Sequence, residues 1–494
     1  MIALDVIQKH AAQTPDRPAL IAVNRYMSWL GFADEVARSA GALAMLFDEL
    51  GPTHPRRIAF LGDSDLDIVV LQAAAATLGI AIVGIDHSLE PAAVAACLDQ
   101  LKPAVFVVSP WRRQLARTAL ARATAQPAVL LHLGASGSSG RSWPKLTASG
   151  SWPPPDGWKQ GPFEAFGFTS GTSGTPKLVV RTESFAARRR AAIVEMFGIT
   201  VDDVYLNTVP LFHASASGWA RIFLSEGAPV VIAGDEDSAC IARLAREHGV
   251  TFTLMVPPVL AKFTEQARVD DARPPLRAIV TGGRHVSPQL VRDVDATFGR
   301  VLHVYYGTTE TGLNTLATPA DLADDPTTAG GAFPGNAIAI VDRHGGRVRP
   351  GEPGFVAISG YMLASHFGDG SAPVIDLDGV QHWVTADTGC LDSDGRLRIF
   401  GRELGDQLHD VIGAEAAVRD LDGVADVAIV LAAPDREAVV AYVPKLPPSA
   451  DLTAEVHATA SAALAGLDVR CLKFDAIPYS PSGKVRPAAL LARA

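Results

Sequence analysis

The chain has 494 residues, 48% of them hydrophobic, and a formal net charge of -10. A single hydrophobic core stops growing well below this length, so we expect two or more domains. A pI of about 5.7 argues against general nucleic-acid binding, which needs a basic face, so we expect no nucleic-acid partner.

The cysteines and the amino terminus carry no sign of secretion. The four cysteines lie far apart and show no C-x-x-C or C-x-x-H spacing, so neither a disulfide scaffold nor a zinc site is indicated. The first residues, MIALDVIQKH, lack the basic start and apolar core of a signal peptide. We therefore expect reduced thiols and a cytoplasmic protein.

The first predicted unit is a strand, a helix and a second strand. Residues 58–61 are an apolar strand, and residues 68–85 form an apolar stretch that glycines and polar residues interrupt, so no membrane span is expected. Ser64 and Asp67 are expected to cap this helix at its start, and Gly79 to end it before the next strand. Such units build parallel sheets that are covered on both faces.

Residues 104–108 and 128–133 are two more apolar strands with an Arg/Ala-rich helix between them, which predicts an α/β domain. Residues 134–158, rich in Gly, Ser and Pro, predict a loose surface connector. Its GASGSSG run has the residue types of a phosphate loop, but no lysine and no strand follow closely. We therefore interpret that run as flexible.

Residues 166–180, FGFTSGTSGTPKLVV, concentrate anion donors in one short loop. Glycines let backbone N–H groups converge, hydroxyls add donors and a lysine adds a charge. The residues expected to bind ATP here are Thr169, Ser170, Gly171, Thr172, Ser173, Gly174 and Lys177. Pro176 separates the last glycine from the lysine and β-branched residues follow, so the loop joins two strands and is not a Walker A loop. The alternative is an ordinary Gly/Ser surface turn.

This loop resembles the phosphate loop of the adenylate-forming ligases, which include acyl-CoA synthetases, free-standing adenylation enzymes and beetle luciferases. The resemblance implies an α/β fold with a large N-terminal domain of two helix-flanked sheets plus a distorted β-barrel, followed by a small mobile α+β domain. Further motifs in the family's order extend the resemblance over essentially the whole chain.

Residues 205–219, YLNTVPLFHASASGW, place a histidine in a turn of small residues. A lone histidine is more often a hydrogen-bonded core residue than a functional one. The resemblance implies that His213 lies beside the acyl pocket and takes part in catalysis. Family members that adenylate α-amino acids usually carry an aspartate here, whereas this turn has His213, Ala214 and Ser215, which argues against an amino-acid substrate.

Residues 250–258 predict a buried strand with a Pro-Pro stop, and residues 278–287, AIVTGGRHVS, match the turn that walls the adenine in the family. The match assigns Gly283 to the nucleotide, while Arg284 and His285 depart from the usual small or apolar residues and their role stays open. By the same carry-over, the acyl pocket is lined by His213, Ser217, Trp219, Gly283, Tyr305 and Gly312. These residues suggest a mainly apolar pocket for an aryl or alkyl acid.

Residues 304–312, VYYGTTETG, predict a strand that ends in nucleotide-binding residues. Tyr306 offers a stacking surface for the base, and Gly307 allows close approach. Thr309 can donate to the α-phosphate, and Glu310 can hold magnesium, since hard cations prefer carboxylate oxygens. Alone, a Thr-Glu pair at a strand end is weak evidence, because it is also a common cap.

Residues 330–342 and 351–360 alternate turns with short strands, which predicts a small β-rich subdomain. Asp387 and Arg402, separated by a hairpin turn at Asp394-Gly395, match the family's pair that binds the ribose hydroxyls. The alternative is that Asp387 only caps a turn.

We expect the domain boundary here, with an adenylate-forming domain over residues 1–401 and a mobile domain over residues 402–494. After Arg402, Leu404-Gly405-Asp406 displaces the lysine and hinge aspartate that the family has, and the glycine-rich loop of its thiol tunnel is shortened. Asp406 is the expected hinge after a one-place slip. Near the carboxyl terminus, P-S-G-K resembles the family's catalytic lysine motif, which assigns Lys484 to catalysis.

The resemblance implies two reactions at one site. A carboxylate attacks the α-phosphorus of ATP with Mg²⁺ to give an acyl adenylate, and the thiol of coenzyme A then displaces AMP. The alternatives are a ligase that loads a separate carrier protein, an enzyme specialised for one half-reaction, a luciferase-like oxygenase, and a non-catalytic homologue that binds acyl groups or nucleotide.

Overall fold

The computed structural model describes residues 2–134, 140–153, 158–169, 176–269, 273–402, 409–432, 437–445, 451–479, 485 and 487–492. Contacts divide the chain into two compact units. Unit 1 comprises Met1–Met255, Val259–Val280 and Ala364–Ser371, and unit 2 comprises Val256–Pro258, Thr281–Leu363 and Ala372–Ala494. The boundary near residue 402 stays a prediction.

Unit 1 contains a five-stranded sheet in the order β4-β3-β5-β6-β7, in which all neighbours are parallel. Its strands are β3 (Arg57–Leu61), β4 (Ala81–Gly84), β5 (Val105–Val108), β6 (Val129–His132) and β7 (Arg141–Ser142). On one face its apolar side chains share a core with two of the helices and with the hairpin that carries the phosphate loop. The expected parallel sheet is thus confirmed.

A second sheet of unit 1 follows the order β13-β12-β10-β11-β1-β2. Within it, β1, β10, β11 and β12 run parallel, and β2 returns antiparallel to β1. Its strands are β1 (Pro18–Ala22), β2 (Arg25–Ser28), β10 (Tyr205–Asn207), β11 (Val230–Ile232), β12 (Phe252–Met255) and β13 (Ala278–Gly282). A third, three-stranded sheet has the order β19-β9-β8. It consists of β8 (Ala165–Phe168), β9 (Leu178–Arg181) and β19 (His366–Phe367).

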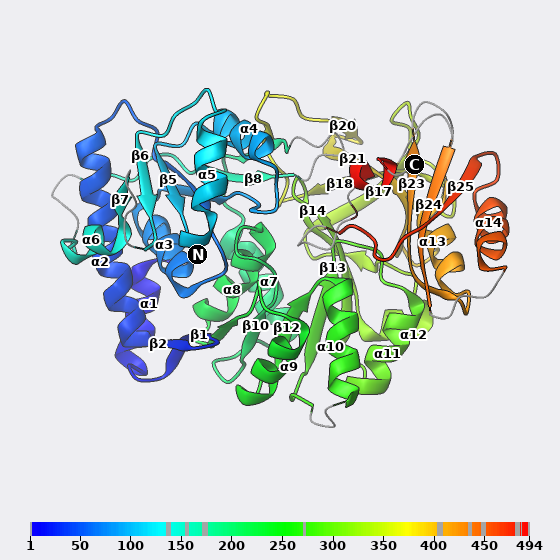
Figure 1. Ribbon diagram of the computed structural model, residues 1–494, viewed down its shortest axis with the longest axis horizontal. Coiled ribbons are helices and arrows are strands. Elements are labelled where there is room, and N and C mark those ends of the chain that lie inside the picture. The colour runs from blue at the N-terminus through cyan, green and yellow to red at the C-terminus, as the bar shows by residue number, and fades with distance from the viewer. Residues whose placement is uncertain are drawn as a thin grey trace. The chain divides into compact units, whose positions relative to one another are not determined.

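The helices of unit 1 flank these sheets, and α2 packs against both α1 and α3 (Figure 1). They are α1 (Leu4–Gln13), α2 (Trp29–Leu50), α3 (Leu66–Leu78), α4 (Pro91–Leu101), η1 (Pro110–Arg112), α5 (Arg113–Leu120), α6 (Trp143–Ala148), α7 (Ala186–Phe197), α8 (Ala214–Ser225), α9 (Ser238–Glu247) and α10 (Pro257–Val269).

The apolar stretch 68–85 is split between α3 and β4, as predicted. Gly79 ends the helix in the left-handed conformation, with φ of 68°, that glycine adopts without steric cost. The expected cap is wrong by one residue, because the Asp65 side chain accepts from the Asp67 N–H, whereas Ser64 accepts from Leu211. None of the helices in the described part of the chain has the length and hydropathy of a membrane span.

Two further expectations need correction. The connector 134–158 is not wholly loose, since it contains β7 and α6, and its end lies so close to α2 that a Cβ at Gly150 would stand 2.0 Å from the Arg38 carbonyl oxygen. The Pro-Pro pair does not simply stop a strand. Proline is favoured in the first turn of a helix, where its missing N–H has no partner to lose, and Pro257 accordingly begins α10.

Unit 2 carries three groups of strands. In the first, β14 pairs antiparallel with β15, and β15 with β16. The second is an antiparallel sheet in the order β17-β18-β21-β20, with β22 paired to β21, and the third has the order β23-β24-β25. The strands are β14 (Leu302–Thr308), β15 (Gly312–Ala317), β16 (Gly331–Ala332), β17 (Asn336–Val341), β18 (Gly354–Gly360), β20 (Val374–Leu377), β21 (Val380–Leu391), β22 (Leu397–Arg402), β23 (Val424–Ala432), β24 (Glu437–Pro444) and β25 (Asp468–Lys473).

The helices of unit 2 are α11 (Pro288–Phe298), α12 (Pro319–Asp324), α13 (Val411–Arg419), α14 (Leu452–Ala463) and α15 (Pro487–Leu491). Helices α13 and α14 share an apolar core with the β23-β24-β25 sheet, which makes the carboxyl-terminal part α+β. The predicted hairpin turn at Asp394-Gly395 joins β21 to β22. Helix-flanked parallel sheets, an antiparallel β-rich part and a terminal α+β part confirm the expected α/β fold class.

Candidate active site

The phosphate loop connects two paired strands, as predicted. β8 and β9 are antiparallel, with Phe168 opposite Leu178. At the base of the loop the Thr169 N–H donates to the Lys177 carbonyl at 3.0 Å. The predicted binding residues Ser170, Gly171, Thr172, Ser173 and Gly174 lie outside the described residues.

The loop is anchored by a residue that the sequence did not single out. The Gln100 side chain, near the end of α4, donates to the Pro176 carbonyl at 2.8 Å and accepts from the Leu178 N–H at 3.0 Å. A primary amide reproduces the pairing of a neighbouring strand here, because it offers one donor and one acceptor side by side. Gln100 therefore fixes the backbone on both sides of Lys177. A glutamine about 77 residues upstream gives no signal in the sequence.

Lys177 itself is exposed, with its ammonium 5.6 Å from the Phe367 ring centroid. Its charge also acts on Asp369, whose pKa is held low mainly by hydrogen bonds from Ser371 and to a lesser degree by Lys177. The lysine is thus accessible to an anion. Its assignment to ATP stays a prediction.

His213 stands at the start of α8 and is half-buried, with its ring 4.3 Å from that of Phe212. Ser217 is hydrogen-bonded to the scaffold, since its hydroxyl and the Gln72 amide lie 2.9 Å apart. Trp219 is 2% exposed and packs against Phe197 and Phe252. These placements give Ser217 and Trp219 a structural task, and their assignment to the acyl pocket stays a prediction.

The motif VYYGTTETG forms a hairpin. The sequence predicted only the first of its two strands. β14 and β15 pair with a shift of register between Tyr306 and Gly307. The turn is braced because the Thr308 and Thr311 hydroxyls lie 2.9 Å apart and Asn314 donates to Thr311 at 2.8 Å. Thr309 and Glu310, both half-buried, stand at the tip of this braced turn.

The glycines of this hairpin allow the backbones of its two strands to approach each other closely. A Cβ at Gly307 would meet the Gly312 carbonyl oxygen at 2.3 Å, and Gly312 has a φ of 77°. The close approach predicted at Gly307 therefore exists, but the group approached is the facing strand. Likewise, a Cβ at Gly282 would lie 2.3 Å from the Tyr305 carbonyl oxygen, and Gly283 has a φ of 77°.

Two predicted nucleoside-binding residues meet in unit 2. The Tyr306 hydroxyl donates to the Asp387 carboxylate at 2.8 Å, and the Asp387 N–H donates to the Thr385 hydroxyl at 3.2 Å. Asp387 also faces Arg402 in the pairing of β21 with β22. Asp387 is thereby fixed in orientation. The side chain of Arg402, like Asp406 and Lys484, lies outside the described residues.

Arg284 and His285, whose role the sequence left open, face the carboxyl-terminal part of unit 2. The Arg284 guanidinium lies 4.1 Å from the Tyr479 ring centroid, and the Tyr479 hydroxyl donates to Asp426 at 2.6 Å. Burial, followed by the positive charges of Arg419 and Arg284, lowers the pKa of His285 to about 4. His285 is therefore neutral at physiological pH.

A magnesium ion that accompanies ATP has one predicted protein ligand, Glu310. One carboxylate fits the group, because Mg²⁺ takes most of its ligands from phosphates and water. Glu310 is half-buried at the hairpin tip. Among the described residues, the three acidic or histidine side chains that lie close enough to share a metal are Asp63, His87 and Asp235, which do not include Glu310.

Unit 1 has a glycine-rich loop between two antiparallel strands, and unit 2 has an oriented Tyr-Asp pair and a braced Thr-Glu turn, which are features typical of nucleotide-using enzymes. The AMP-binding enzyme family matches residues 7–367. The chain belongs to this family, the adenylate-forming ligases.

Individual relatives differ in the acceptor that their names give. The chain is 28% identical over 406 residues to indoleacetate–CoA ligase from Aromatoleum aromaticum, covering 80% of this chain and 78% of the relative. It is 26% identical over 501 residues to the fatty acid–[acyl-carrier-protein] ligase ScoC from Streptomyces coeruleorubidus, covering 96% and 93%. The amide bond synthetase McbA from Marinactinospora thermotolerans shares the fold, with a TM-score of 0.84 at 21% identity and 99% coverage of both chains.

Proposed function

We propose that this protein activates an aryl or alkyl carboxylic acid with ATP and then transfers the acyl group to the thiol of coenzyme A. The observation that carries the proposal is the 2.8 Å contact of Tyr306 with Asp387, beside the braced turn with Thr309 and Glu310. These are the residue types that a base, a ribose, a phosphate and its metal require. The similarity to a CoA ligase over 80% of the chain supports the same activity.

In the first reaction the chain holds two anions together. Tyr306 offers its ring to the base, and Asp387 accepts from the ribose hydroxyls. Lys177 and the loop donors bind the phosphates, while Thr309 donates to the α-phosphate. Magnesium, held by Glu310, would offset further phosphate charge. Orientation and charge neutralisation supply most of such a rate enhancement.

The acid would lie beside the turn of His213, with Tyr305 and Gly312 as further contacts. Its carboxylate attacks the α-phosphorus, the bond to pyrophosphate breaks, and Lys484 offsets the charge that develops on the leaving group. In the second reaction the thiol sulfur attacks the acyl carbon, AMP leaves, and the thiol proton passes to solvent or a nearby base. The mobile terminal domain, turning about Asp406, would separate these two reactions.

A carrier protein is the second candidate acceptor. The specific observation in its favour is the similarity, over 96% of this chain, to a ligase that acts on an acyl carrier protein. The shortened stretch after Arg402, in the segment expected to line the thiol tunnel, also fits an acceptor other than free coenzyme A. An enzyme of one half-reaction is the third candidate.

A screen of carboxylic acids for ATP-dependent hydroxamate formation tests the proposal, because hydroxylamine traps the acyl adenylate whatever the natural acceptor is. We expect hydroxamate with a small set of aryl or alkyl acids, and none without ATP. Acids that react are then offered coenzyme A, a phosphopantetheinylated carrier protein and an amine. Nucleotide binding without hydroxamate from any acid would favour a non-catalytic homologue.

A further inference from the structure

The turn that carries Phe212 and His213 is held by polar side chains from the segment after β3 and from α3. Ser64, which follows β3, accepts from the Leu211 N–H at 3.1 Å. Gln72 of α3, 5% exposed, donates to the Leu211 carbonyl at 3.4 Å. The segment just before the ring of Phe212 is therefore fixed to the β4-β3-β5-β6-β7 sheet and its helix.

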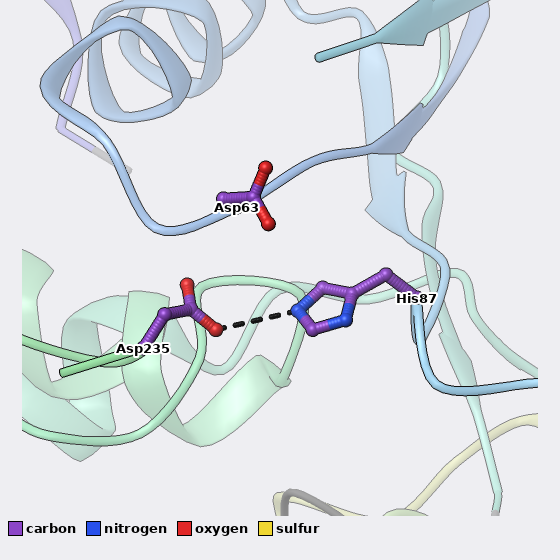
Figure 2. Close-up of side chains that lie close together, drawn as sticks. All are labelled: Asp63, His87 and Asp235. Carbon is purple, nitrogen blue, oxygen red and sulfur yellow. Dashed lines mark hydrogen bonds and ion pairs between the residues drawn. The ribbon is translucent and has the colours of Figure 1, made fainter. Parts of the chain in front are cut away.

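His87 lies beside Asp235 (Figure 2) and extends this attachment to the Phe212 ring. His87 follows β4, and its side chain is 8% exposed, with Nε2 3.3 Å from an Asp235 carboxylate oxygen. Asp235 follows β11 of the neighbouring sheet, and its other oxygen accepts from the Ser64 N–H at 2.5 Å. The imidazole stands edge-on to the Phe212 ring, at 5.1 Å between centroids and 78° between planes. This pair, in which the imidazole is shielded and Asp235 is exposed, thus joins both sheets and Phe212.

The backbone at the end of β4 lies close against Phe212. A Cβ at Gly84, the last residue of β4, would stand 2.4 Å from Phe212 Cα and 2.5 Å from its Cβ. The end of β4 and the turn therefore touch directly. Because the Phe212 backbone is in contact with β4 and its ring is in contact with the imidazole, a shift of His87 is expected to move Phe212 and with it the adjacent ring of His213.

The same three acidic and histidine side chains do not need a metal. Their ligand atoms lie within 4.8 Å of one another, but Asp63 accepts from the Ser109 hydroxyl at 2.8 Å and from the Arg112 Nε at 2.8 Å. Burial alone would raise the pKa of Asp235, but hydrogen bonds from His87 and Ser64 outweigh it and lower the pKa below its usual range. Protein donors already satisfy both carboxylates.

We propose that His87 and Asp235 are positioning residues that hold Phe212 and His213 at the acyl pocket and thereby set which carboxylic acids the enzyme accepts. The proposal rests on the proposed function, in which this turn lines the acyl pocket. It extends that function to two residues outside the predicted substrate contacts. Their loss changes the use of the acid and leaves the use of ATP unchanged, because the interactions of the pair reach Ser64 and Phe212 at this turn.

The test compares His87→Ala with His87→Gln, which keeps a donor at the reach of Nε2 toward Asp235. His344→Ala, an exposed histidine of unit 2, serves as the matched control. Pyrophosphate release is measured over a series of acids of increasing size, with separate KM values for acid and for ATP. For His87→Ala we expect a rise of about tenfold or more in the acid KM and a changed order of preference. The ATP KM should stay within about twofold, and His87→Gln should recover most of the acid KM.

Three results would overturn the proposal. The first is an unchanged acid KM and order in His87→Ala, and the second is an equal rise of both KM values. The third is binding of Zn²⁺ alone by the wild-type protein, lost in His87→Ala, which would indicate an ion site. If His87→Ala fails to fold in a thermal melt, Asp235→Ala and His87→Gln give the same comparison. Wild-type protein that releases no pyrophosphate with any acid would instead reject the proposed function, and the inference with it.

Discussion

Lys484 is the residue on which the adenylation half-reaction depends most in this account. Lys484→Ala should raise the activation free energy of adenylate formation by about 3 to 4 kcal/mol, because it removes a group that neutralises developing charge. The rate of this half-reaction should fall accordingly. Reaction of a pre-made acyl adenylate with the thiol should survive. Both rates are measured in single turnovers, with the exposed Lys473→Ala as control. Equal losses in the two half-reactions would remove Lys484 from the catalytic assignment.

Gln100 tests the phosphate loop without touching any residue that is expected to contact ATP. Gln100→Ala removes the bonds to Pro176 and Leu178, each worth about 1 kcal/mol. The strand ends that hold Lys177 then lose their anchor, so we expect the KM for ATP to rise about fivefold to tenfold while the KM for the acid changes little. Steady-state kinetics measure both, with the exposed Gln8→Ala alongside. An unchanged ATP KM would show that the loop holds its shape without Gln100.

Sequence reading reached the residues of the candidate site that are close in sequence and missed those that depend on distant contacts. Hydroxyls, glycines and a lysine within residues 166–180 indicated a phosphate loop, since the chemistry is local. Gln100 gave no signal, because its partners lie about 77 residues away and become partners only when α4 packs beside β9. The roles of Asp387 and Lys484 came from resemblance to a family and not from their own surroundings.

The β14–β15 hairpin is the element whose geometry matters most, and Gly307 tests it. An alanine Cβ there would meet the Gly312 carbonyl oxygen at 2.3 Å, which should lower the free energy of unfolding by about 1 to 3 kcal/mol. Thr309 and Glu310 would shift with the turn, so nucleotide affinity should fall as well. Denaturant titration and calorimetry measure the two effects. Gly331→Ala, whose Cβ would meet nothing within 4 Å, is the control, and equal stability of the two variants would contradict the account.

The segment of Arg284 and His285 predicts a pH dependence of stability. The pKa of His285 is lowered from 6.5 to about 4, so the unfolded chain binds the proton more strongly than the folded chain. Stability from this group is therefore present above pH 6.5 and declines as the pH falls toward 4, by about 3 kcal/mol at most. Denaturation of the wild type and of His285→Gln across this range isolates the contribution. The exposed His344→Gln serves as control. Identical pH profiles for His285→Gln and the wild type would contradict the predicted contribution of His285.

Among the helices and strands, the sequence predicted those that an apolar pattern and a terminating glycine define. Helix α3 and strand β4 followed from an apolar run with Gly79 between them. Strand β15 was not predicted, because the turn before it depends on hydrogen bonds among Thr308, Thr311 and Asn314. Such side-chain bonds cannot be inferred from the sequence pattern. The connector 134–158 was expected to be loose because its composition is that of a linker. The packing of Gly150 against α2 is a contact between distant segments.

At the scale of the whole molecule, the trimmed segment after Arg402 predicts an imbalance between the two half-reactions. The residues expected to serve adenylation are present, whereas the stretch expected to serve the thiol step is shorter than in the resembling family. We therefore expect transfer to coenzyme A to be slower than adenylation of the same acid. Quenched-flow single turnovers measure both steps. A transfer step as fast as adenylation or faster would contradict the prediction, and faster transfer to a carrier protein would identify the acceptor.

The central claim is that the protein forms an acyl adenylate, and isotope exchange between pyrophosphate and ATP tests it most directly. The exchange requires reversible adenylation and no acceptor, so it does not depend on the identity of the thiol. We predict exchange that appears only when a suitable carboxylic acid is added and that falls by about two or more orders of magnitude in Lys484→Ala. Bound ATP without exchange for any acid in a broad panel would contradict the account.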